Sequence, residues 1–122
     1  MSVSQRRLER LKEQLYQEIS LIIQNEIKDP RLSGIISVIS LDLSKDLHNA
    51  IVYISVYSNK DIELCRKKNL DALHSSRKYI MYLLSKKLKI KYIPELEFRL
   101  DLSMEEADRI NKILKENTKK GL

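Results

Sequence analysis

The chain of 122 residues contains one cysteine, two glycines and two prolines. The single cysteine, Cys65, excludes an intramolecular disulfide framework and fits a reducing cytosol. Phosphate-cradling loops need several glycines, because backbone N–H groups must approach the ligand closely. Gly34 and Gly121 do not suffice for such a loop. The low glycine content therefore excludes most nucleotide-dependent enzymes.

Long apolar runs are also absent from the sequence. No stretch approaches the ~20 apolar residues that span a bilayer. The first residues place Arg6, Arg7 and Glu9 beside Leu8, a pattern unlike that of a signal peptide. With 43% hydrophobic and 33% charged residues, the composition fits one folded domain with a heavily charged surface. We therefore expect a cytoplasmic protein without a membrane partner.

The net charge of +6 is concentrated in one segment. Residues 60–91 hold ten basic residues and three acidic ones, whereas the opposite charges elsewhere nearly cancel. A concentrated positive potential attracts polyanions more strongly than diffuse charge does. The first expected ligand is therefore an RNA or DNA backbone, and the alternative is an ordinary solvated helix surface.

The first half of the chain predicts one helix and two strands. Apolar residues spaced by three and four indicate a helix over 5–27, which begins after the N-cap Ser4 and ends before Pro30. Segments 35–43 and 49–57 are rich in β-branched and aromatic residues and predict a hairpin. The inner faces are expected to carry Ile35, Ser37, Ile39, Leu41 and Leu43 in the first strand, and Ala50, Val52, Ile54 and Val56 in the second.

The second half predicts a long helical segment, a strand and a final helix. The segment 61–88 contains weak helix formers at 74–78, where we expect a kink or a break into two helices. Residues 93–101 alternate as a strand, and Ser103 with Glu106 forms a capping box. The inner face of the final helix is expected to carry Ala107, Ile110 and Leu114. These elements predict a two-layer α+β domain with helices on one face of a three-stranded sheet, which can be mixed.

One side of the long helical segment carries candidate contacts to nucleic acid. Its lysines lie opposite the apolar stripe, and Tyr82 among them can stack on a base. Arg31, in the turn after the first helix, can add a phosphate contact. The candidate RNA-binding residues are Arg31, Lys67, Lys68, Arg77, Lys78, Tyr82, Lys86, Lys87, Lys89 and Lys91.

The sequence offers no catalytic or metal-binding pattern. His48 and His74 are far apart, and no spacing of histidine and cysteine resembles a zinc site. Acidic residues at strand ends, such as Asp42, Asp46 and Asp101, are explained by the local hydrogen bonds that Asp makes in turns. We therefore expect no catalytic residue, metal ion or cofactor.

A series of short motifs runs along nearly the whole chain, from about Arg6 to Leu114. The motifs are Glu-Ile-Lys-Asp-Pro-Arg-Leu at 26–32, the hairpin segment 44–56, Ala-Leu-His-Ser at 72–75, Ile-Pro-Glu-Leu-Glu-Phe at 93–98 and Asp-Leu-Ser at 101–103. In this order and at these spacings they resemble the bacterial ribosome-binding factor A family.

The resemblance implies a KH-like domain of the second topological type, helix-strand-strand-helix-helix-strand, with a short C-terminal helix. We expect this domain over 1–116 and a flexible tail over 117–122. The family relationship also implies a non-enzymatic factor that binds the 30S small ribosomal subunit and its 16S rRNA. It implies late maturation and 5′-end processing of that RNA, a role in the cold, and a free protein that is monomeric and has no small-molecule substrate.

One segment departs from the family pattern. KH domains that grip single strands use a Gly-x-x-Gly loop, and this family has an Ala-x-Gly kink at that place. The matching residues here are Ser76-Arg77-Lys78, without glycine. We therefore expect phosphate contacts through the side chains of Arg77 and Lys78 rather than through a close backbone approach.

Two other functions are compatible with the sequence. A generic RNA-binding chaperone would use the same basic helix without a defined target, and a protein–protein adaptor would use the charge for solubility. An assembly factor would form a discrete complex with the small subunit, whereas a generic chaperone would bind any polyanion without saturation. The association of a protein–protein adaptor with its partner would be unaffected by nuclease.

Overall fold

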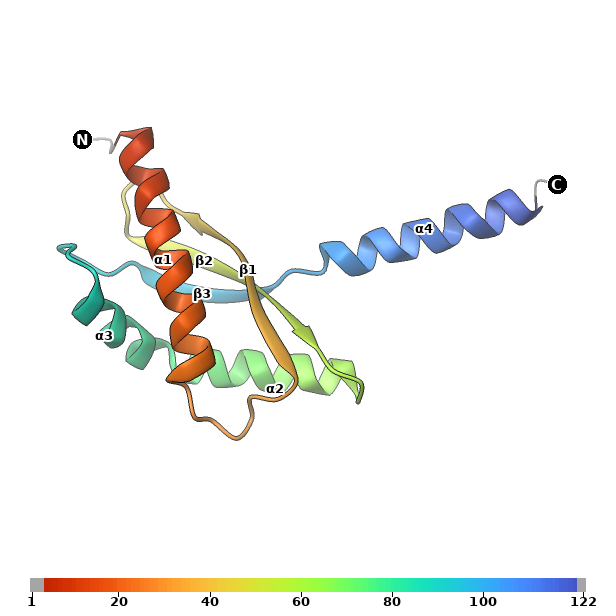
Figure 1. Cartoon of the computed structure of the whole chain (residues 1–122), viewed down its shortest axis with the longest axis horizontal. Helices are drawn as coiled ribbons and strands as arrows, with labels where there is room; N and C mark the ends of the chain where they lie inside the picture. Colours follow the sequence, from red (N-terminus) through yellow and green to blue (C-terminus); the bar gives the residue numbers. More distant parts are fainter. Residues whose placement is uncertain (1–3, 121–122) are drawn as a thin grey trace.

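The computed structural model describes residues 4–120, apart from some side chains of the last helix. Its elements are α1 (Gln5–Asn25), β1 (Ile35–Leu43), β2 (Asn49–Tyr57), α2 (Ile62–Ser75), α3 (Arg77–Lys87), β3 (Glu95–Leu100) and α4 (Ser103–Lys120). Figure 1 shows α1, α2 and α3 beside the sheet and α4 projecting away from it. The predicted α+β class and the KH-like order, α-β-β-α-α-β, are confirmed.

The sheet is mixed, with the strand order β1-β2-β3. β1 and β2 form an antiparallel hairpin, whereas β2 and β3 are parallel, with Asn49 opposite Glu95 and Ile54 opposite Leu100. Parallel neighbours need a crossover connection, which α2 and α3 provide. This connection places the basic segment of the chain on the helical layer of the domain.

One apolar core lies between the sheet and the three helices that cover it. The alternation of β2 sends Ala50, Val52, Ile54 and Val56 into this core, as predicted. Each large side chain removed from water contributes about 1.5–3 kcal/mol to folding. The fully buried members include Leu15, Ile19, Ile22, Val52, Ile54, Leu73, Ile80, Leu84 and Leu96. Among residues 4–120, no helix combines the length and the apolarity needed to cross a bilayer.

The predicted inner face of β1 is wrong in its first half. The pairing with β2 shifts between Val38 and Ser40, which leaves Ile39 as the extra residue of a β-bulge. The inserted residue reverses the alternation, so Val38 and Leu41 are both buried while Ile35 and Ile39 are exposed. Simple period-two counting cannot detect this change of face.

The predicted break in the crossover segment is confirmed at Ser76. α2 ends at Ser75 and α3 begins at Arg77, with Ser76 at φ −89° and ψ 0°. The Ser76 N–H still donates to the Ala72 carbonyl at 3.0 Å, and the Ile80 N–H donates to the Ser76 carbonyl at 2.9 Å. The chain therefore changes direction here without leaving these backbone groups unpaired.

The predicted inner face of the last helix is also wrong. Ile110 and Leu114 are 56% and 57% exposed, because α1, α2 and α3 already cover the helical side of the sheet while α4 points away (Figure 1). The predicted start at Ser103 is confirmed, and its N–H and hydroxyl both donate to the Asp101 carboxylate. The Glu106 side chain of the expected capping box lies outside the described residues. The backbone of 117–120 continues α4, so the division of the chain at 116 stays a prediction.

Candidate nucleic-acid interface

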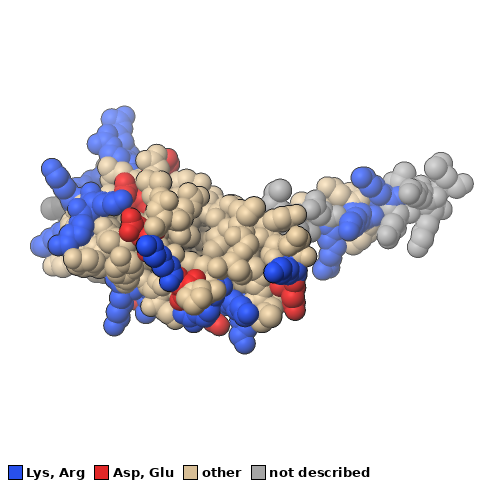
Figure 2. Space-filling view, turned by 60° about the horizontal axis from the view of Figure 1, so that its bottom comes forward, with Lys and Arg blue, Asp and Glu red and all other residues tan. Residues whose placement is uncertain are grey.

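Four exposed lysines of α2 and α3 form what we call the α2–α3 lysines. Within the described residues, none of them takes part in an ion pair, so their charge is not neutralised by a neighbouring carboxylate. These four are Lys67, Lys68, Lys78 and Lys86. In the view of Figure 2, which brings the α2 and α3 side forward, Lys and Arg outnumber Asp and Glu. This side of the molecule is therefore electropositive.

Tyrosines are interleaved with these lysines on α3. Tyr82 is 55% exposed, and the Lys86 Nζ lies 5.2 Å from the centre of its ring. Tyr79, one helical turn earlier, is exposed as well and was not identified from the sequence. A base that stacks on Tyr82 from the uncovered side would keep this cation–π contact.

Arg31 is the candidate that is held most firmly by a neighbour. Its Nε and Nη2 donate to the two carboxylate oxygens of Asp29 at 3.1 and 2.7 Å, and its backbone N–H donates to Oδ1 at 2.9 Å. These hydrogen bonds lower the pKa of Asp29 from 3.8 to about 2. The guanidinium is thus already paired, which weakens Arg31 as a phosphate contact.

Two further candidates have acidic partners. The Arg77 Nε lies 3.5 Å from the Oε1 of Glu95, and the Lys87 Nζ lies 3.4 Å from the Oε2 of Glu18. Both contacts are ion pairs, but neither the Arg77 Nε nor the Glu18 Oε2 makes a hydrogen bond. A phosphate would have to compete with these carboxylates.

The break between α2 and α3 opens onto a hollow of about 470 Å³ next to β2 and β3. Its walls include His74, Arg77, Glu95 and Glu97. The negative charges of the two glutamates disfavour an anionic ligand. Each glutamate forms an ion pair with an arginine, Glu95 with Arg77 and Glu97 with Arg99, the latter at 3.1 Å. The segment without glycine therefore does not form a strongly positive cradle for a phosphate.

The last two lysine candidates lie elsewhere. The chain leaves the helix at Leu88, which has φ −105° and ψ 135°, so Lys89 and Lys91 belong to the α3–β3 loop. They line the same hollow as arginines of the first turns of α1. Lys89 and Lys91, which the sequence pattern groups with the lysines of the helical segment, therefore lie outside it, and the basic residues form two groups. Figure 2 shows Lys and Arg gathered at the left end of the molecule, where Figure 1 places this loop and the start of α1.

Neither histidine belongs to a metal site, because the described residues contain no group of three or more His, Cys, Asp or Glu side chains that could hold a metal ion. The His74 Nε2 lies 3.1 Å from the Phe98 carbonyl oxygen, which ties α2 to β3. His48 is exposed in the β1–β2 turn, 3.6 Å from an Asp46 carboxylate oxygen. Both residues have local structural partners.

Comparison with known proteins identifies relatives over nearly the whole chain. The model of the family described as ribosome-binding factor A matches residues 7–114. A ribosome-binding factor A from Caldanaerobacter subterraneus subsp. tengcongensis is 38% identical over 119 residues, which cover 98% of this chain and 95% of that protein. One from Clostridium botulinum strain Alaska E43 is 42% identical over 105 residues, which cover 86% of this chain and 89% of that protein.

Solved structures are similar as well. The crystal structure of ribosome-binding factor A from Thermus thermophilus has a TM-score of 0.65 and 26% identity, covering 76% of this chain and 93% of that one. A homology model of the Thermus thermophilus protein, fitted into a cryo-electron-microscopy map of a 30S–RbfA complex, has a TM-score of 0.61 and 26% identity with the same coverage.

Proposed function

Because the chain belongs to the ribosome-binding factor A family, we propose that it is a non-enzymatic assembly factor that binds the 30S ribosomal subunit. The relative fitted into the map of a 30S complex supports this target. In this chain, the observation that carries the proposal is the set of α2–α3 lysines, which are exposed and lack an acidic partner among the described residues. Such lysines are available to phosphate groups of the 16S rRNA.

The arrangement of these groups favours a defined RNA target over a generic polyanion. Arg31, Arg77 and Lys87 are paired with carboxylates, so that the unpaired cations occupy particular places on the surface. Exposed tyrosines next to the α2–α3 lysines add stacking surfaces that a purely electrostatic chaperone does not need. Binding by such a surface depends on the shape of the RNA as well as on its charge.

We further propose that binding promotes late maturation and 5′-end processing of 16S rRNA in the cytoplasm, most strongly in the cold. Misfolded RNA helices rearrange slowly at low temperature, so a protein that binds the correctly folded RNA has its largest effect there. Binding shifts an equilibrium only by its differential affinity for two states. Release would therefore follow from maturation of the subunit or from another factor.

The test is sedimentation of the tagged protein with ribosomal fractions from cells grown at two temperatures. We expect a stoichiometric complex with free small subunits, enriched in immature ones, and little protein on translating ribosomes. Deletion of the gene should lead to unprocessed small-subunit RNA, most of all in the cold. Equal sedimentation with both subunits and with bulk RNA would support the generic chaperone, and nuclease-resistant association would support the adaptor.

A further inference from the structure

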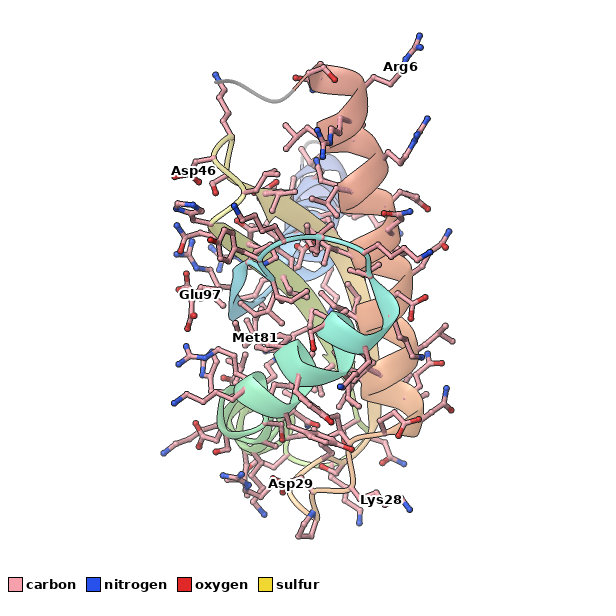
Figure 3. All side chains as sticks on the ribbon, turned by 90° about the vertical axis from the view of Figure 1, so that its left-hand side faces the viewer. Arg6, Lys28, Asp29, Asp46, Met81 and Glu97 are labelled. Atoms are coloured by element: carbon pink, nitrogen blue, oxygen red, sulfur yellow. The ribbon has the colours of Figure 1, made fainter. Side chains whose placement is uncertain are left out.

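A second group of positive charges that lack ion pairs among the described residues lies outside the α2–α3 lysines, around a hollow of about 550 Å³. Three segments distant in the sequence form its walls: the first three turns of α1, the β1–β2 turn and the α3–β3 loop. We call it the α1-end hollow. Figure 3 places Arg6 of α1 and Asp46 of the β1–β2 turn at the same end of the molecule, opposite Lys28.

Five cationic side chains line the α1-end hollow. Arg6, Arg7 and Arg10 come from α1, and Lys89 and Lys91 come from the α3–β3 loop. None of the five has an ion-pair partner in the part of the chain described here. Together they give the hollow a positive potential that attracts anions.

The one carboxylate in the wall, Asp46, offsets only part of the charge of the five cations. Asp46 accepts hydrogen bonds from the Ser44 hydroxyl at 2.7 Å and from the His48 N–H at 3.0 Å. These bonds lower the pKa of Asp46, so the carboxylate stays ionised and is oriented by the β1–β2 turn, with no ion pair to the five cations among the described residues. In the same turn Leu47 adopts a left-handed conformation with φ 65°, and its side chain packs against the core. The wall of the hollow is therefore held in place.

An exposed aromatic ring stands beside the cations. Tyr92 is 68% exposed and lines the hollow, with the Lys91 Nζ 5.5 Å from the centre of its ring. Leu11, Leu47 and Ile90 add apolar surface to the same walls. Phosphate-binding cations next to an aromatic face and apolar surface match a nucleotide unit, which carries both a charged and a stacking part.

We propose that the α1-end hollow binds a single-stranded segment of RNA, with phosphates among the α1 arginines and the loop lysines and a base against Tyr92. The inference rests on the proposed function for its source of RNA, and it adds a second contact at the end of the domain remote from Lys28. An acidic protein segment would satisfy the charges but not the stacking surface, so RNA is the occupant that uses both features.

The first experiment measures binding of a labelled, short single-stranded oligouridylate by fluorescence anisotropy at several salt concentrations. The variant Arg10→Gln with Lys91→Gln removes one cation from each of two walls. We expect its log–log salt slope to be flatter by about 1.4, because each single-strand phosphate contact contributes about 0.7. The matched control, Lys28→Gln with Lys60→Gln, removes two charges outside the hollow and should keep the wild-type slope.

The second experiment separates stacking from charge. Tyr92→Ala should weaken oligouridylate binding at least about fivefold, since stacking on a base contributes about 1–3 kcal/mol. Tyr57→Ala is the matched control, because Tyr57 is also 68% exposed but does not line the hollow. Backbone amide shifts should move at Leu47, Ile90 and Tyr92 on addition of oligouridylate. All variants should retain the wild-type melting temperature.

The outcomes distinguish this inference from the proposed function. Wild-type slopes in the hollow variant, or equal effects of both tyrosine substitutions, overturn the hollow as an RNA site even if the protein binds small subunits. An oligoglutamate peptide that binds equally well and shifts the same amides overturns the choice of RNA. Hollow-dependent oligouridylate binding by a protein that fails to bind small subunits would refute the proposed function and leave the hollow in place.

Discussion

The Asn69 side chain pairs with the backbone of Ser33 as one peptide group pairs with another. Its Oδ1 accepts the Ser33 N–H at 3.1 Å, and its Nδ2 donates to the Ser33 carbonyl at 3.1 Å. The same Nδ2 donates to the Cys65 carbonyl at 2.7 Å, and Asn69 is fully buried. The loop between α1 and β1 is thereby joined to α2, although it has no regular secondary structure of its own.

Replacement of Asn69 should therefore destabilise the protein. Asn69→Leu removes both partners of the Ser33 backbone, and buried polar groups left without partners cost about 1–3 kcal/mol. Denaturation in urea should show this loss in the free energy of unfolding. Ser33→Ala is the control, since it keeps the Ser33 backbone groups and Asn69. An equal loss of unfolding free energy in both variants would show that the hydrogen bonds between the Asn69 side chain and the Ser33 backbone make no specific contribution to stability.

Gly34, the next residue in that loop, should not tolerate a side chain. Its φ is +71°, and a Cβ there would overlap the carbonyl oxygen of Tyr57 on β2. The left-handed conformation alone costs a non-glycine residue about 1–2 kcal/mol, and the overlap adds to this. We expect Gly34→Ala to lower the melting temperature clearly. Ser37→Ala, at an exposed position of β1, should leave it nearly unchanged.

The Asp29–Arg31 pair should be visible in a pH titration. The Asp29 carboxyl should titrate with a pKa of about 2, because hydrogen bonds from Arg31 favour its charged form. A lowered folded-state pKa means that the pair favours folding above pH 3.8 and that this contribution is lost as the pH falls toward 2. Carbon-13 shifts of the carboxyl group report the titration. Arg31→Gln should return the pKa toward 3.8, whereas Lys28→Gln should not.

The same pair predicts a gain of RNA binding on mutation. Asp29→Asn releases the Arg31 guanidinium, which then becomes available for a phosphate. The salt slope for binding small-subunit RNA should become steeper by about 0.7. The double variant Asp29→Asn with Arg31→Gln should show the original slope. An unchanged slope in Asp29→Asn would remove Arg31 from the candidate interface.

Much of the fold follows from local patterns in the sequence. The bounds of β1 and β2, the N-cap at Ser4 and the break at Ser76 are predicted correctly, because periodicity and weak helix formers act locally. The bulge at Ile39 and the exposed position of Ile110 depend on which surfaces are already covered. Such competition between elements is a tertiary effect, and no single segment records it.

The candidate site was less predictable for the same reason. The exposure of Lys67 and Lys78 follows from helical periodicity. However, the pairing of Lys87 with Glu18 joins α3 to α1, and Lys91 of the α3–β3 loop lines the same hollow as Arg10 of α1. Asn69 gave no signal either, because a lone asparagine in a helix pattern resembles any polar position. Contacts between distant segments decide which charges are neutralised.

Neutralising the α2–α3 lysines tests the interface on which the proposed function rests. Changing all four to Gln should flatten the salt slope for small-subunit RNA by roughly 3, at about 0.7 for each contact. The melting temperature should stay close to the wild-type value, because these side chains are exposed and make no ion pair among the described residues. The control changes four other exposed lysines, Lys28, Lys60, Lys112 and Lys115, to Gln. A similar flattening in both quadruple variants would mean that overall charge governs binding, and the generic chaperone would replace the assembly factor. An unchanged slope in a folded variant of the α2–α3 lysines would show that the RNA interface lies on another surface of the domain.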